Sequence, residues 1–76
     1  MTREDYNKYN ENMKIIYDIE CRKKLVKVFG HDVIEIFDCF GHCNENNDIV
    51  FDVEVKTKYS YLHLRNVPLE KLQFEY

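Results

Sequence analysis

Residues 49–56 read IVFDVEVK, and the rest of the predicted fold is built around this stretch. Apolar and polar residues alternate along it, which is the period of a β-strand with one buried and one solvated face. The apolar set is Ile49, Phe51, Val53 and Val55. A shift by one residue would instead bury the carboxylates of Asp52 and Glu54. We therefore expect a strand whose aliphatic side lines the core.

Two neighbouring stretches share this alternation, VIEIFDCF at 33–40 and YSYLHLRN at 59–66. The polar run GHCNENND at 41–48 and the pair Thr57–Lys58 separate the three predicted strands, the second as a tight hairpin turn. Connections this short require antiparallel neighbours, so the strands form a meander. Pro68 ends the last strand. A helical turn at 69–72 and a short strand at 73–76 are expected to follow.

Residues 2–29, before these strands, have the period of an amphipathic helix. Thr2 and Asp5 resemble a capping box, and Gly30 stands where a helix ends in the left-handed conformation. The apolar stripe comprises Tyr6, Tyr9, Met13, Ile16, Tyr17, Cys21, Leu25 and Val28. We expect this stripe to cover the aliphatic face of the sheet. Whether the segment is one helix or two, broken at Asn10–Asn12, stays open because it is long for a small domain.

The predicted fold is α+β, a single domain over residues 1–76. An N-terminal long helix packs on a three- to four-stranded antiparallel meander, that is αβββ plus a short C-terminal element. The alternative is a small SH3-like barrel with an N-terminal helix, in which 67–71 form the turn before a final strand at 72–76. A chain of this size buries only about 60% of the surface that its unfolded form exposes. A deep catalytic cleft is difficult to build on that scale.

Charge and composition narrow the function classes. The net charge of −3 argues against direct nucleic-acid binding, and no apolar stretch approaches the roughly 18–20 residues of a membrane span. The polar N-terminal stretch predicts no signal peptide, so the three cysteines are expected to be free thiols in a reducing cytoplasm. Asn, Ile, Lys, Tyr and Phe make up 32 of the 76 residues, a bias typical of AT-rich genomes of bacteria and their phages.

The meander leaves one sheet face outside the core, and this face is the predicted partner-binding site. It carries Glu35, Phe37, Asp52, Glu54, Tyr59, Tyr61, His63 and Arg65. Tyrosine and arginine are common anchors at protein interfaces. Carboxylates gathered on a sheet can also occupy a basic channel as phosphate mimics. The alternative is that these residues only stabilise a solvated face as cross-strand pairs.

The candidate metal ligands are Cys39, His42 and Cys43. Structural zinc usually requires two spaced ligand pairs, and the second pair is missing, so we predict no metal and no cofactor. A catalytic nucleophile needs a positioned base and an oxyanion hole, and the sequence offers one serine, Ser60, and no glycine-rich loop. His63 beside Asp52 or Glu54 is the one expected acid–base pair. We predict that the protein is not an enzyme.

Arg22, Lys23, Lys24 and Lys27 form the basic cluster of the chain. Cations at the end of a helix stabilise it through the dipole, and they can also contact nucleic acid. The predicted function is a stoichiometric protein-binding module in the cytoplasm. Its expected form is a phage-encoded, anti-CRISPR-like inhibitor of a host nucleic-acid-handling protein or nucleoprotein. The alternatives are a self-associating structural protein, such as a homodimer paired through exposed sheet edges, and a small nucleic-acid-binding regulator.

Overall fold

The N-terminal helix α1 spans Arg3–Arg22 in the computed structural model, which describes residues 2–76. The predicted capping box is present: the Asp5 amide donates to Thr2 Oγ1 at 3.1 Å, and the Thr2 amide donates to an Asp5 carboxylate oxygen at 3.3 Å. The helix is continuous through Asn10–Asn12. The prediction that it extends to residue 29 is wrong, because Lys23 already has extended backbone angles.

The segment after the helix is a strand, β1 (Lys24–Val28). Leu25 and Val28 are both buried, and their spacing of three residues fits a helix as well as a bulged strand. A register shift between Leu25 and Lys27 leaves Val26 as the extra residue, so both apolar side chains reach the same side. Gly30 is therefore a hairpin residue: Phe29 and Gly30 have φ of 49° and 78°, the pattern of a two-residue turn with positive φ at both positions.

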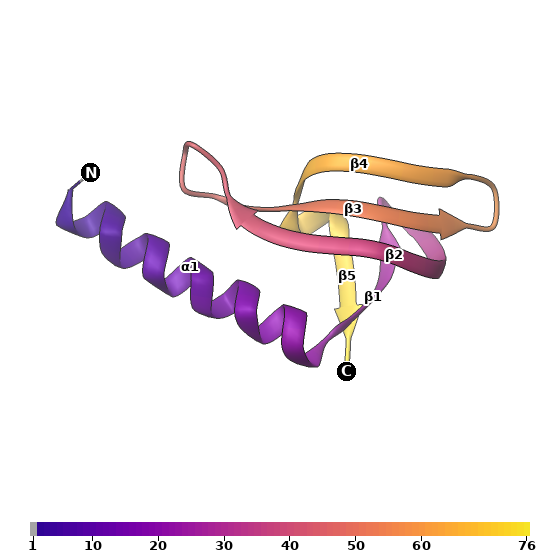
Figure 1. Ribbon diagram of the computed structural model, residues 1–76, viewed down its shortest axis with the longest axis horizontal. Coiled ribbons are helices and arrows are strands. Elements are labelled where there is room, and N and C mark those ends of the chain that lie inside the picture. The colour runs from indigo at the N-terminus through magenta and orange to yellow at the C-terminus, as the bar shows by residue number, and fades with distance from the viewer. Residues whose placement is uncertain (1) are drawn as a thin grey trace.

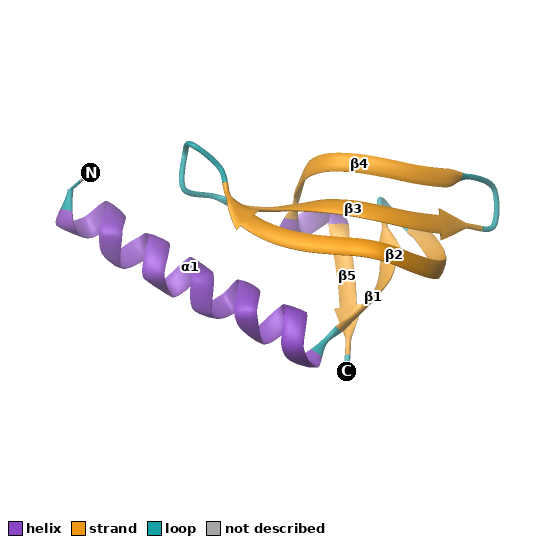
Figure 2. Cartoon of the chain, viewed as in Figure 1, coloured by secondary structure: helices purple, strands orange, loops and turns teal. Residues whose placement is uncertain are grey.

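Four further strands complete one antiparallel sheet with the order β4-β3-β2-β1-β5 (Figures 1 and 2). Their bounds are β2 (His31–Cys43), β3 (Ile49–Thr57), β4 (Tyr61–Pro68) and β5 (Leu72–Glu75), with a 3-10 turn, η1 (Leu69–Lys71), before the last strand. The predicted α+β fold is confirmed, including the strand end at Pro68, the helical turn and the terminal strand. The turn at 67–71 and the final strand of the barrel alternative correspond to η1 and β5, with β5 paired to β1. The sheet is open, because β4 and β5 do not pair with each other within residues 2–76.

Strand β2 is longer than predicted and carries two bulges. Its register against β3 shifts between Val33 and Glu35 and again between Ile36 and Asp38, which leaves Ile34 and Phe37 without a partner. Each bulge reverses the alternation of side chains between the two faces. Strict alternation through residues 33–40 predicts that Ile34, Ile36 and Phe40 lie on the aliphatic face. For Ile34 and Phe40 this prediction is wrong, and both side chains are exposed.

The connections also differ from the prediction. Strand β2 continues to Cys43, so the polar loop is residues 44–48 rather than 41–48. The hairpin between β3 and β4 has three residues, 58–60, instead of the tight pair Thr57–Lys58. The buried Thr57 hydroxyl accepts from the amides of Tyr59 and Ser60 and donates to the Ser60 carbonyl. This side chain closes the turn that Asn-Gly closes in other hairpins.

The core lies between β2–β4 and the strands β1 and β5, which cross them steeply in Figure 1. Phe74 of β5 contacts Phe51 of β3 with ring centroids 5.5 Å apart, although the two strands are not neighbours in the sheet. The fully or nearly buried cluster is Ile19, Leu25, Val28, Phe51, Val53, Val55 and Val67. The prediction that the eight apolar residues of the N-terminal segment cover the aliphatic face is thus wrong. Of the residues in α1, only Ile16 and Ile19 are buried, and side chains of β1 and β5 pack over the rest of that face.

Candidate functional site

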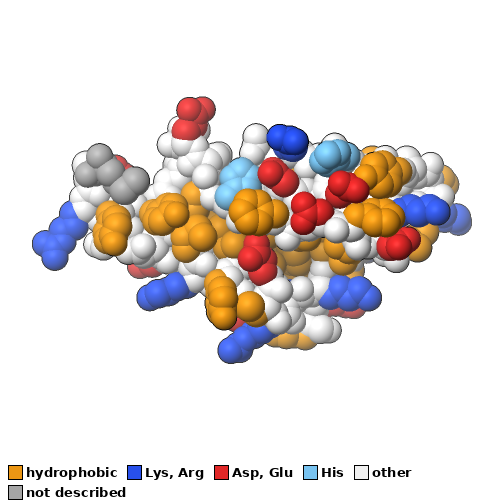
Figure 3. Space-filling view, viewed as in Figure 1, with side chains coloured by type: hydrophobic (Ala, Val, Ile, Leu, Met, Phe, Trp, Pro, Cys, Tyr) orange, Lys and Arg blue, Asp and Glu red, His pale blue; other side chains and the backbone are white. Residues whose placement is uncertain are grey.

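The outer face of β2–β4 brings side chains from three strands into cross-strand rows. One row is Asp38, Glu54 and His63, and the next is Glu35, Lys56 and Tyr61. Phe40 lies opposite Asp52 in a third row. We call these eight residues the acidic face. Figure 3 views this side of the molecule, where acidic side chains lie at the centre with histidines and hydrophobic side chains beside them.

Asp38 and Glu54 are direct partners across β2 and β3. Side chains at such positions are about 4.5–5.5 Å apart at their Cβ atoms, and like charges there destabilise a sheet. None of the four carboxylates of the acidic face is within ion-pair distance of a lysine or arginine in the described part of the chain. Asp38 and Glu54 therefore have no ion-pair partner in the described part of the chain, and the lysine of the face, Lys56, belongs to the next row.

Tyr61 supplies the aromatic part of the face. Its hydroxyl donates a hydrogen bond to a Glu54 carboxylate oxygen, and this bond raises the pKa of Tyr61. Its ring is tilted against that of Phe37, with centroids 5.7 Å apart. The bulge at Phe37 is what turns this side chain toward β4. Two exposed rings thus border the carboxylates on one side.

Asp52 is held at the other end of the face. One oxygen, Oδ1, accepts from the Asn66 amide at 3.1 Å and contacts His42 Nε2 at 3.1 Å. The Asn66 amide first, and His42 second, lower the pKa of Asp52 below its usual range, and the nearby positive charge of Arg65 adds to this effect. Asn66 has φ of 56° at a bulge of β4, so the strand irregularity itself aims this amide at the carboxylate.

The predicted site residues are only partly brought together. Glu35, Asp52, Glu54, Tyr61 and His63 share the acidic face, Phe37 reaches it through Tyr61, and the charge of Arg65 acts on Asp52. Tyr59 lies in the 58–60 turn, 82% exposed, with Lys58 Nζ 5.7 Å from its ring centroid.

Three further residues, Asp38, Phe40 and His42, belong to this side of the sheet, and strict alternation from residue 33 misassigns or misses them. The ring of His42 stacks on Phe40 at 5.8 Å as well as contacting Asp52. His63, the histidine expected in an acid–base pair, lies opposite Glu54, whereas the pair that forms is His42 with Asp52. Their side of the sheet depends on the two bulges of β2, which the sequence pattern does not reveal.

The candidate metal ligands do not converge. After the second bulge β2 alternates regularly, so Cys39 and Cys43 point to one face and His42 to the other. Residues 2–76 contain no group of three His, Cys, Asp or Glu side chains placed to hold a metal ion. Burial first, and then the charges of Glu20 and Asp38, raise the pKa of the Cys39 thiol to about 11. The thiol is therefore protonated at neutral pH, which disfavours its use as a ligand or nucleophile.

The basic cluster is not confined to a helix end. Arg22 closes α1 and pairs with Asp18 at 3.2 Å, while Lys24 and Lys27 belong to β1. Lys27 pairs with Asp32 at 3.6 Å, and Lys23 lies 5.5 Å from the ring centroid of Tyr76. The prediction that all four cations serve the helix dipole is wrong for the two in β1.

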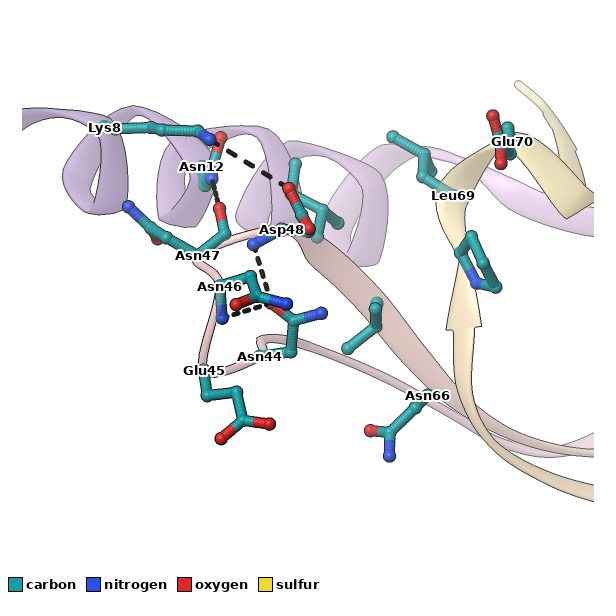
Figure 4. Close-up of a pocket in the computed structure, with 13 residues that line it drawn as sticks. Lys8, Asn12, Asn44, Glu45, Asn46, Asn47, Asp48, Asn66, Leu69 and Glu70 are labelled. Carbon is teal, nitrogen blue, oxygen red and sulfur yellow. Dashed lines mark hydrogen bonds and ion pairs between the residues drawn. The ribbon is translucent and has the colours of Figure 1, made fainter. Parts of the chain in front are cut away.

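A separate cleft of about 850 Å³ opens between α1, the loop 44–48 and the end of β4 (Figure 4). Its lining includes the amide side chains of Asn12, Asn44, Asn46, Asn47 and Asn66. Asn44 accepts from the amides of Asn46 and Asp48, and Asn12 donates to the Asn47 carbonyl at 2.8 Å. Asn47 Nδ2 also donates to the Asp5 carbonyl at 3.0 Å, so Asn12, Asn44 and Asn47 shape the loop and fasten it to α1. Asn47 Oδ1 is buried and has no hydrogen-bond partner among the described residues.

None of the helices in residues 2–76 combines the length and the apolar character that crossing a bilayer requires. Comparison of the chain with protein-family models, with curated proteins and with solved structures gives no match.

Proposed function

We propose that this protein binds a basic surface of another protein, stoichiometrically, through the acidic face. The observation that carries the proposal is the like-charge pair Asp38 and Glu54, set directly opposite each other across two central strands without an ion-pair partner in the described residues. A like-charge pair lowers the stability of the free protein by about 0.2–1 kcal/mol. A lysine or arginine from a partner would relieve that repulsion on binding, so the same pair favours the complex.

The aromatic side chains support a protein partner. Phe37, Phe40 and Tyr61 are each more than half exposed beside the carboxylates. An arginine can stack on such a ring while its guanidinium binds a carboxylate, which gives aromatic and acidic side chains together a specificity that acids alone lack. Phosphate backbones, in contrast, would meet the negative charge of Asp38 and Glu54.

The partner class that we propose is a nucleic-acid-handling protein. Its phosphate-binding groove is lined with lysine and arginine, so an acidic protein can occupy it in place of the nucleic acid. A phage-encoded inhibitor of such a host protein, similar in its mode of action to anti-CRISPR proteins, is the form of this function that we propose. Binding rather than catalysis is proposed because Phe40 and the Asn66 amide, not a nucleophile, are the described neighbours of the His42–Asp52 pair.

The test compares three tagged proteins as bait in lysate of the source cell. The wild type is set beside Asp38→Asn/Glu54→Gln, which removes the paired charges without changing side-chain size. The control is Glu11→Gln/Glu75→Gln, which removes the same charge from exposed sites on α1 and β5. We expect one protein to be retained by the wild type and the control and released by the face variant. Equal retention by all three, or no specific protein on any of them, would contradict the proposal.

The captured protein is then purified and titrated. We expect a one-to-one ratio of chains, an affinity that falls as salt rises, and competition with nucleic acid for the same partner. Simultaneous binding of nucleic acid and this protein would refute the phosphate-mimic mechanism while leaving protein binding intact.

A further inference from the structure

Helix α1 carries a second apolar stripe that the fold covers only in part. Ile16 and Ile19 face the core, and Tyr6, Tyr9, Met13 and Tyr17 recur at steps of three or four residues along the side next to them. Their exposed fractions range from 36% to 71%. In Figure 3 hydrophobic side chains run along the helix toward the sheet. We call these four residues the helix stripe.

The solvent-accessible surface of the molecule is larger than that of a compact protein of the same mass. A monomeric protein of 9.3 kDa is expected to expose about 5,000 Å², whereas this chain exposes 5716 Å². The radius of gyration is 13.1 Å, against roughly 11.4 Å for a compact domain of this length. The excess of roughly 700 Å² reflects an elongated shape, with extents of 44 × 23 × 18 Å, in which α1 reaches past the sheet (Figure 1). A standard interface takes about 800 Å² from each partner, an area that so extended a surface can supply.

We propose that a second copy of this chain covers the helix stripe, with two α1 helices packed together about a two-fold axis. The stripe is uncharged, and tyrosine and methionine are enriched in interface cores. Lys14 borders the stripe beside Met13 and Tyr17, but no charged residue belongs to the stripe itself, so two copies meet there with less repulsion than at the acidic face. Pairing through the acidic face would set carboxylates against carboxylates, so charge selects the helix stripe as the self-association surface.

Sheet edges are a poorer route to the same dimer. From Val33 onward the edge of β2 away from β3 has no strand partner in residues 2–76, because β1 pairs only with its first two residues. The edge is blunted, however, by the bulges at Ile34 and Phe37 and by the charges of Glu35 and Asp38. Bulges and charges are the devices that keep exposed edges from pairing. Dimerisation through the helix stripe uses none of the residues of the acidic face, so this proposal does not depend on the proposed function.

The test is the mass of the full chain in solution, measured by sedimentation from low to high micromolar concentration. We expect twice 9.3 kDa for the wild type. Met13→Glu buries an unpaired carboxylate in the interface and is expected to weaken self-association by about 100-fold or more. Ile15→Glu is the matched control, an equally drastic change on the same helix at a position outside the stripe, and it is expected to stay dimeric. A monomeric wild type, or equal dissociation of both variants, would overturn the proposal.

A second measurement does not depend on any variant. In an equimolar mixture of isotope-labelled and unlabelled wild type, contacts between copies are detected by filtered NMR experiments. We expect them at Tyr9, Met13 and Tyr17. A dimer whose contacts lie only on the strands would overturn the assignment to α1.

Discussion

Substitution of Gly41 by alanine tests how the helix is attached to the sheet. A Cβ atom at residue 41 would lie 2.7 Å from Ile16 Cγ2 and 2.7 Å from Phe51 Cε2, well inside van der Waals contact. Phe51 is fully buried and Ile16 is 2% exposed, so neither side chain can move into solvent. The Gly41 amide also donates to Glu20 of α1 at 2.9 Å, and this bond lengthens if the helix shifts outward.

Overpacking of this kind costs roughly 1–3 kcal/mol. The total stability of a domain of this size is commonly about 3–5 kcal/mol, so Gly41→Ala is expected to remove a large part of it. The corresponding fall in melting temperature is roughly 5–20 °C, at about 4–8 °C per kcal/mol. Urea unfolding and thermal melting, both followed by circular dichroism, measure the two quantities.

Two further variants test whether any loss of stability comes from the clash of the new methyl group with Ile16 and Phe51. Gly30→Asn is the control, because its site has φ of 78° and nothing within 4 Å of the added Cβ, and asparagine tolerates this conformation. It is expected to unfold close to the wild type. Ile16→Ala in the Gly41→Ala background makes room for the new methyl group, so the two changes should be less than additive by at least about 1 kcal/mol. Wild-type stability of Gly41→Ala, or strict additivity with Ile16→Ala, would show that α1 does not rest on Gly41.

Three other outcomes follow from the charges and thiols. Asp38→Asn removes a cross-strand repulsion and is expected to raise the free energy of unfolding in urea by about 0.2–1 kcal/mol; a loss of stability would mean that the carboxylate has a favourable partner. The pKa of Asp52 is lowered in the folded protein, chiefly by the Asn66 amide, so its stabilisation is complete above the ordinary value of 3.8 and is lost as the pH falls through the lower folded value. Asp52→Asn should therefore flatten the acid limb of the urea midpoint between pH 5 and pH 2, and an unchanged limb would contradict this assignment. At pH 8 Cys39, whose pKa is raised to about 11, should react with a disulfide reagent at least about tenfold more slowly than the exposed Cys21; equal rates by mass spectrometry would argue against its burial.

Only part of the candidate site can be predicted from the sequence. The side of β3 that carries Asp52 and Glu54 follows from strict alternation, because any other register buries carboxylates. The alternation of β4 predicts the face of Tyr61 and His63 in the same way. Asp38, Phe40 and His42 do not, because their side of the sheet depends on two bulges in β2 whose positions carry no glycine or turn residue in the sequence.

The capping box of α1, the core face of β3, the end of β4 at Pro68 and the closing strand can all be predicted from the amino-acid sequence. Each of these depends on residues close together in the chain, where side-chain period and backbone chemistry act directly. Two features depend instead on long-range contacts: residues 24–28 form a strand, and β1 and β5, rather than α1, cover most of the aliphatic face of the sheet. The spacing of three between Leu25 and Val28 suits a helix turn and a bulged strand equally. Pairing of Leu25 with Phe74, almost fifty residues away, selects the strand, because only the folded chain brings β5 alongside β1.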